Sequence, residues 1–148
     1  MTEVLFYHLE TRSLDAVLPQ LLEKTLERGW RAVVEVGSTE RAEALDSHLW
    51  VYRDDSFLPH GLAGSDLDPH QPILLTTGSD NPNQATVRFF VDRAVPADTL
   101  GYQRIVYLFS GHDPDAVAEA RQAWRALREG NEVTYWQQDT SGRWKKMA

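Results

Sequence analysis

The chain contains no cysteine, and none of its apolar runs approaches the ~20 residues that a membrane-spanning helix needs. Without cysteine it forms no disulfide bond, no thiolate metal site and no catalytic thiol. The N-terminus has neither the basic start nor the long apolar stretch of a signal peptide. We therefore expect a protein of the cytoplasm that has no membrane partner.

Motifs for phosphate binding and catalysis are also missing. The chain has no Gly-x-Gly-x-x-Gly, no Gly-x-x-x-x-Gly-Lys-Ser/Thr and no Gly-x-Ser-x-Gly sequence, and its five histidines show no metal-ligand spacing. We expect a non-catalytic protein with no cofactor and no bound metal. One alternative stays open, a small nucleotide- or phosphometabolite-binding enzyme. Gly37-Ser38-Thr39 would meet the phosphate at a helix start, and His60 would act as the base.

Positive charge is scarce. Lysine and arginine number 15 against 22 aspartate and glutamate residues, so the formal net charge is −7. This balance argues against direct nucleic-acid binding as the main role, and so against the alternative that Trp124, Trp144 and the basic C-terminal tail bind single-stranded DNA. Residues 1–113 hold 9 basic against 17 acidic side chains (−8), whereas residues 114–148 hold 6 against 5 (+1). The C-terminal part is therefore the candidate for meeting an acidic partner, unless the charges are simply scattered over the surface.

The 148 residues, 42% of them hydrophobic, favour one domain that spans residues 1–148. Short apolar runs predict strands, and amphipathic stretches predict helices between them. We expect strands at 4–9, 31–36, 72–77, 86–91, 103–109 and 132–137, and helices at 13–28, 40–50 and 114–129. Pro19 lies near the first turn of its helix or kinks it. The alternation predicts an α/β fold with a largely parallel central sheet flanked by helices, like nucleotide-binding folds but without a phosphate loop.

The segment 49–62 is unusually apolar for a loop that follows a helix. Its large apolar side chains are Trp50, Phe57, Leu58 and Leu62. Loops are usually polar because their backbone must meet water. This segment therefore either folds back onto the core or offers its side chains to another protein.

The last predicted helix has an apolar face and a basic face. At ~100° per residue, its arginines Arg121, Arg125 and Arg128 lean away from the apolar side, and Trp124 lies on the border. One interpretation is a solvated basic face with Trp124 partly in the core. The other is a groove with an aromatic floor and a ridge of guanidinium groups. Such a groove would suit a peptide with an apolar end and a carboxylate, because arginine pairs with carboxylates through two hydrogen bonds.

Four segments together match a family pattern that covers nearly the whole chain. They are Val4-Leu5-Phe6-Tyr7-His8-Leu9, Ala44-Leu45-Asp46-x-x-Leu49-Trp50, Ser56-Phe57-Leu58-Pro59-His60-Gly61-Leu62-Ala63-Gly64, and Ala120-Arg121-x-x-Trp124-Arg125 followed by Gly130. On these residues the chain resembles the chi subunit family of bacterial DNA polymerase III. The resemblance implies a non-catalytic accessory subunit that bridges the clamp loader to single-stranded-DNA-binding protein during DNA replication. It also implies a nucleotide-binding type of fold without a working nucleotide site.

The resemblance implies that one face meets the psi subunit of the clamp loader, or its equivalent. The positions that match this face are Trp50, Phe57 and Leu62, with Leu58 beside them. The apolar segment 49–62 suits such a contact.

The resemblance further implies that a second face binds the acidic, hydrophobic C-terminal peptide of single-stranded-DNA-binding protein. The positions that carry this face match Arg121, Trp124 and Arg125, while Arg128 is placed to add charge and Phe109 to wall the pocket. This chain departs from the pattern by having Trp124 in place of a tyrosine. It also has Val117 where well-known members have a lysine.

Overall fold

The structure is a computed structural model that describes residues 2–52, 58–96 and 101–148. Within these residues, one sheet of eight strands is flanked by three helices, which confirms the predicted α/β class. The strands are β1 (Glu3–Leu9), β2 (Ala32–Val36), β3 (Gly61–Leu62), β4 (Ile73–Thr76), β5 (Val87–Val91), β6 (Arg104–Ser110), β7 (Glu132–Gln138) and β8 (Trp144–Lys146). The helices are α1 (Leu14–Glu27), α2 (Thr39–Val51) and α3 (Pro114–Leu127), and Asp68–His70 form a short 3-10 turn.

The strands follow the order β3-β4-β2-β5-β6-β1-β7-β8. All neighbours are parallel except β7 and β8, which are antiparallel. The prediction of a largely parallel sheet is therefore confirmed. The sequence did not indicate β3 and β8, because strands of two and three residues carry no usable alternation.

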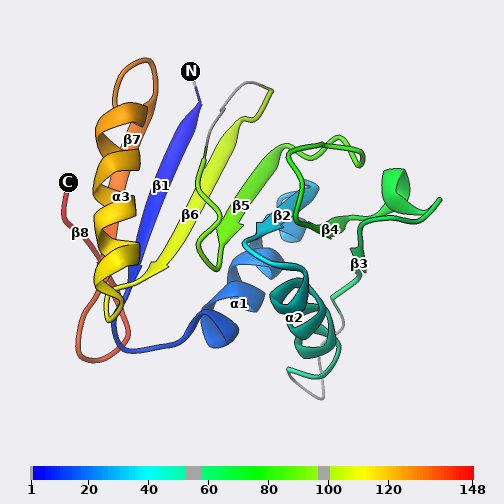
Figure 1. Ribbon diagram of the computed structural model, residues 1–148, viewed down its shortest axis with the longest axis horizontal. Helices are drawn as coiled ribbons and strands as arrows, with labels where there is room; N and C mark the ends of the chain where they lie inside the picture. Colours follow the sequence, from blue (N-terminus) through cyan, green and yellow to red (C-terminus); the bar gives the residue numbers. More distant parts are fainter. Residues whose placement is uncertain (1, 53–57, 97–100) are drawn as a thin grey trace.

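β1 lies in the middle of the sheet, between two strands from the far end of the chain. Phe6 pairs in register with Tyr107 of β6 on one side and with Tyr135 of β7 on the other. The chain leaves β1 through α1 toward β2, but it leaves β6 through α3 toward β7. Because these crossovers run in opposite directions, α1 and α3 cover opposite faces of the sheet. Figure 1 shows α3 lying along β7, with α2 and β3 at the other end of the molecule.

The core lies on both faces of the sheet, as expected for parallel strands. α1 and α2 pack on one face through side chains that include Val17, Leu18, Leu22, Leu45 and Leu49. α3 packs on the other face through three small residues, Ala116, Ala120 and Ala123, and through Leu127 near its end. The alanines let the helix backbone approach the large rings of the sheet, so the aromatic side chains supply most of the apolar area on this face.

Pro19 lies within α1, beyond its first turn, and is buried. A proline has no N–H, so the carbonyl of Asp15 one turn earlier receives no helical hydrogen bond from it. Nε2 of His48, on α2, donates to that carbonyl at 2.6 Å. The gap that proline leaves in α1 is therefore filled by a contact that ties α1 to α2.

The half of the sheet that α3 does not reach is stabilised by a buried arginine. Arg88 of β5 is 2% exposed, and its Nη2 lies 2.5 Å from Oε1 of Glu35 on β2. Its guanidinium also donates to the hydroxyl of Tyr102 and to the carbonyls of Gly78 and Asp80. The arginine thus ties the loop after β4 to the sheet.

We predict that Glu35→Gln lowers the free energy of unfolding by about 3 kcal/mol, because it leaves a buried guanidinium without its counter-charge. Urea unfolding measures the change. Glu43→Gln, at an exposed position of α2, is the matched control and should stay within about 0.5 kcal/mol of the parent. Equal stabilities of the two variants would show that the Arg88 network is not stabilising.

Candidate functional site

Helix α3 begins where β6 ends because its first turn is capped. The side chain of Asp113 accepts hydrogen bonds from the amides of Asp115 and Ala116 at 3.0 and 3.4 Å, and Pro114 takes the first helical position. The alanine face then seats the helix on the sheet. This seating turns the basic side chains of the helix toward solvent.

The structure brings four of the predicted residues together on α3. Arg121, Arg125 and Arg128 are exposed, and Trp124 is half-buried. The centroid of the Trp124 ring lies 5.5 Å from that of Phe6, and the two planes are nearly perpendicular at 79°. Cζ of Arg128 lies 5.9 Å from the centroid of the Trp124 ring. The result is an aromatic surface fixed by the core and bordered by guanidinium groups.

Tyr135 of β7 belongs to the same surface, although sequence reasoning did not identify it. Its ring centroid lies 5.8 Å from that of Trp124, and its hydroxyl lies 2.6 Å from Nδ1 of His8. Burial raises the pKa of Tyr135, and the nearby Arg121 opposes that rise. Alternation along β7 indicates that Tyr135 and Val133 share a face, but only the sheet order shows that this face lies under α3.

Phe109, at the end of β6, is 5% exposed and lies deeper than expected for the wall of a pocket. Its ring centroid is 5.0 Å from that of His8 and 6.0 Å from that of Tyr135. Tyr135 in turn contacts Trp124. Phe109 therefore supports the α3 surface through its neighbours and offers little area of its own.

The residues predicted to contact the psi subunit differ in how far they are exposed to solvent. Trp50, near the end of α2, is 48% exposed, and Leu62 of β3 is 36% exposed. Leu58 is only 2% exposed and belongs to the core, so it is not accessible to a partner. Phe57 lies outside the described residues. The structure thus corrects the expected surface at Leu58, because that side chain fills the space beneath α2.

His60 has a structural role next to Trp50. Its Nδ1 lies 2.6 Å from the carbonyl of Leu58, and its Nε2 lies 3.0 Å from the carbonyl of Asp46 and 3.2 Å from Oδ1 of the same residue. Its ring centroid is 4.2 Å from that of Trp50. His60 is buried, and its Nε2 holds the returning chain against Asp46 of α2, while the Nδ1 contact lies within the returning chain itself.

The residues of the alternative enzyme do not converge. Ser38 caps α2 by accepting a hydrogen bond from the amide of Arg41, and Gly37 packs against the carbonyl of Asp92, 1.8 Å from where a Cβ would lie. His60 contacts Asp46, which is eight residues further along α2. At 1.5 Å per residue, this separates the helix start from His60 by about 12 Å. A phosphate bound at the start of α2 would therefore lie beyond the reach of the His60 imidazole.

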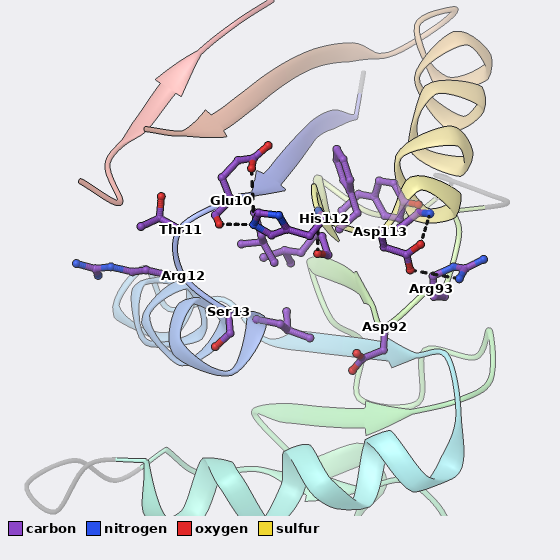
Figure 2. Close-up of a pocket in the computed structure, with 15 residues that line it drawn as sticks. Glu10, Thr11, Arg12, Ser13, Asp92, Arg93, His112 and Asp113 are labelled. Carbon is purple, nitrogen blue, oxygen red and sulfur yellow. Dashed lines mark hydrogen bonds and ion pairs between the residues drawn. The ribbon is translucent and has the colours of Figure 1, made fainter. Parts of the chain in front are cut away.

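A cavity of about 500 Å³ lies at the carboxyl ends of β1 and β6, where the two crossovers diverge (Figure 2). Nucleotides bind at this point in many folds of this type. Here the carboxylates of Glu10, Asp92 and Asp113 line the cavity, and Asp113 already occupies the amides at the start of α3. The side chain of Arg93 pairs with Asp113 at 3.5 Å. The described lining sets three carboxylates against Arg12 and Arg93, and the amides that would cradle a phosphate at the start of α3 are already used by Asp113.

Comparison with known proteins identifies the family. The family model for the DNA polymerase III chi subunit, HolC, matches residues 1–134. The chain belongs to this family. It is 28% identical over 112 residues to the probable DNA polymerase III subunit chi of Rickettsia prowazekii (strain Madrid E), a match that covers 74% of this chain and 66% of that protein.

A second relative is matched over more of its length. The chain is 26% identical over 132 residues to the DNA polymerase III subunit chi of Pseudomonas aeruginosa (strain PAO1), covering 87% of this chain and 91% of the relative. Membership of the chi family places the protein among the accessory subunits of a DNA replication enzyme. Among the described residues of this chi-family chain, the helices are too short or too polar to cross a membrane.

His8, which contacts the hydroxyl of Tyr135, makes the stability of the folded protein depend on pH. Burial lowers the pKa of His8 below its ordinary value of 6.5, and the Glu10 carboxylate, 2.7 Å from Nε2, opposes this only in part. The folded protein therefore binds a proton on His8 less readily than the unfolded chain does. The stability that the neutral His8 side chain contributes is therefore present above about pH 6.5, and it is lost as the pH falls below that value.

We predict that the parent protein loses more unfolding free energy between pH 7.5 and pH 5.5 than His8→Gln does, since only the parent carries this proton linkage. Urea unfolding at a series of pH values measures the difference. The carboxylates and the other histidines are common to both proteins and cancel. Parallel pH profiles would mean that His8 titrates alike in the folded and unfolded states.

Proposed function

We propose that this chi-family chain bridges the clamp loader to single-stranded-DNA-binding protein by capturing the C-terminal peptide of that protein on α3. The observation that supports this proposal is the half-buried Trp124 bordered by three exposed arginines, in a chain whose net charge is −7. This surface combines an apolar floor with local positive charge. A peptide that is acidic and ends in apolar side chains and a carboxylate matches both properties.

In the proposed complex, the terminal carboxylate pairs with Arg121 or Arg125. The apolar side chains pack on Trp124 and Tyr135, and the acidic residues before them meet Arg128. Most of these contacts are exposed, so added salt weakens the complex. Trp124 is already held by the core, which limits the entropy lost when the peptide binds.

The proposed contact with the psi subunit, or its equivalent, uses Trp50 and Leu62. Both are exposed and lie beside α2, near the β3 edge of the sheet. Phe57 remains a predicted member of this contact, whereas the buried Leu58 is left out. α3 lies along β7, near the opposite edge (Figure 1). This separation supports a bridge, because the two partners do not compete for one surface.

We predict that Arg121→Ala weakens binding of the tail peptide at least tenfold, because it removes a charge-assisted contact of about 1.5–3 kcal/mol. Calorimetric titration with a synthetic peptide of about ten residues measures the affinity. Lys146→Ala is the matched control, since Lys146 is an exposed cation of β8 that pairs in register with Trp136 and therefore points to the sheet face opposite α3. Unchanged affinity of Arg121→Ala would remove this residue from the site.

We expect that amidation of the peptide C-terminus also weakens binding at least tenfold, because the terminal carboxylate is the proposed partner of the arginines. The same titration compares the free acid and the amide. If both peptides bind equally, the acidic side chains and not the terminus are recognised. If neither binds, tail capture on α3 is wrong.

We predict that Trp50→Ala abolishes binding to the psi subunit and leaves tail-peptide binding unchanged. Trp50 is half-exposed on α2, which contacts β3 and β4 at the end of the strand order opposite β7, so its loss does not disturb Trp124. Co-purification with psi tests the first part, and the peptide titration tests the second. Circular dichroism checks the fold, and loss of both activities with an intact fold would contradict two separate surfaces.

A further inference from the structure

A second hollow lies on the opposite face of the sheet from α3. It is a cleft of about 330 Å³ between α1 and the strands β1 and β8. The wall on α1 extends from Val17 to Arg28, about 16 Å at 1.5 Å per residue. Across from it stand Tyr7 and Trp144, whose ring centroids are 4.7 Å apart at 66°. Figure 1 shows α1 nearer to β2 than to β8.

The cleft gathers positive charge in an acidic protein. Arg12, Lys24, Arg28 and Arg104 line it, and its described lining contains no aspartate or glutamate. Lys24 and Arg28 are one helical turn apart on α1, and Arg12 lies before the helix begins. The charge of Arg104 is already balanced by an ion pair, since its Nε donates to Oε1 of Glu3 at 2.6 Å. A cleft lined by cations and by no carboxylate has a positive local potential, which favours a bound anion.

Aromatic rings alternate with these cations. Cζ of Arg28 and Cζ of Arg104 each lie 5.2 Å from the ring centroid of Trp30, which stands beside the cleft. Burial raises the pKa of the Tyr7 hydroxyl, while Arg104 and Arg28 oppose that rise and Glu3 adds to it. The guanidinium groups therefore act directly on the aromatic wall.

The end of the cleft nearest Arg12 is built by a buried glutamine. Gln138 is 4% exposed, and its Oε1 accepts the amides of Glu10, Thr11 and Arg12 at 3.0, 3.1 and 3.1 Å. These three bonds hold the loop before α1 against β7. The backbone of Arg12 is thereby fixed at the end of the cleft before any ligand arrives, so only its side chain has to be ordered on binding.

We propose that this cleft binds a short stretch of single-stranded nucleic acid. Its phosphates would lie along Arg12, Lys24 and Arg28, and its bases would stack on Trp144 and Tyr7. A groove of about 16 Å accommodates roughly four stacked nucleotides at ~3.4 Å each. Cations interleaved with aromatic rings are how proteins hold single strands without reading their sequence. A peptide of acidic residues alone would use the cations but would leave the rings without a matching group.

Fluorescence anisotropy with a labelled thymidine oligonucleotide of about ten nucleotides, at low salt, tests the proposal on the full chain. We expect saturable binding that weakens as salt is added. Lys24→Glu with Arg28→Glu should weaken it at least tenfold. Arg125→Glu with Arg128→Glu makes the same change in net charge on the opposite face and should alter it less than twofold. Circular dichroism checks each variant, and Lys24→Gln with Arg28→Gln replaces the first pair if that pair does not fold.

Three results would overturn the proposal. The first is no binding by the parent chain at low salt. The second is a loss in the Arg125 and Arg128 pair at least as large as that in the Lys24 and Arg28 pair, which would attribute the binding to net charge or to the α3 surface. The third is a polyglutamate peptide that binds the cleft while the oligonucleotide does not, which would make the occupant an acidic protein segment. The test is independent of tail capture on α3, because that surface is altered only in the control.

Discussion

The position of β1 between β6 and β7 is the constraint on which both surfaces of this protein depend. The first strand of the chain is hydrogen-bonded on each side to strands about a hundred residues later. Its consecutive side chains then point to opposite faces. Phe6 supports Trp124 beneath α3, and Tyr7 contacts Trp144 beside the cleft along α1. One strand therefore positions the aromatic floor of two basic surfaces, and the crossovers that leave β1 and β6 put a helix beside each.

The nucleotide-binding type of fold is retained without its phosphate chemistry. The crevice where the crossovers diverge still encloses a cavity, but Glu10, Asp92 and Asp113 line it, and Asp113 uses the amides that a phosphate would need. Arg93 in the crevice is paired with Asp113, whereas the exposed arginines of α3 and the cations along α1 lie outside it. This arrangement agrees with a subunit that binds extended partners, the role that we propose for this member of the chi family.

The net charge of this chain and the local charge of the cleft along α1 indicate different kinds of partner. A value of −7 argues against an anionic partner, yet Arg12, Lys24, Arg28 and Arg104 meet in one cleft whose described lining lacks a carboxylate. The average hides this because the four residues come from three separate parts of the sequence. The basic side of α3 was readable from the sequence, since one helical period places its arginines together. The cleft was not, because it requires α1, β1, β6 and β8 to meet.

The sequence by itself determined the elements and their class. Apolar runs and amphipathic stretches identified six strands and three helices, because their periodicity is a local property, and their alternation implied a parallel sheet. Only the tertiary structure decided the features that depend on contacts between residues far apart in the sequence. It added the short edge strands β3 and β8, placed Leu58 in the core, and brought Tyr135 under α3. Burial and pairing are set by residues far along the chain, and a local pattern carries no information about which of them will be adjacent.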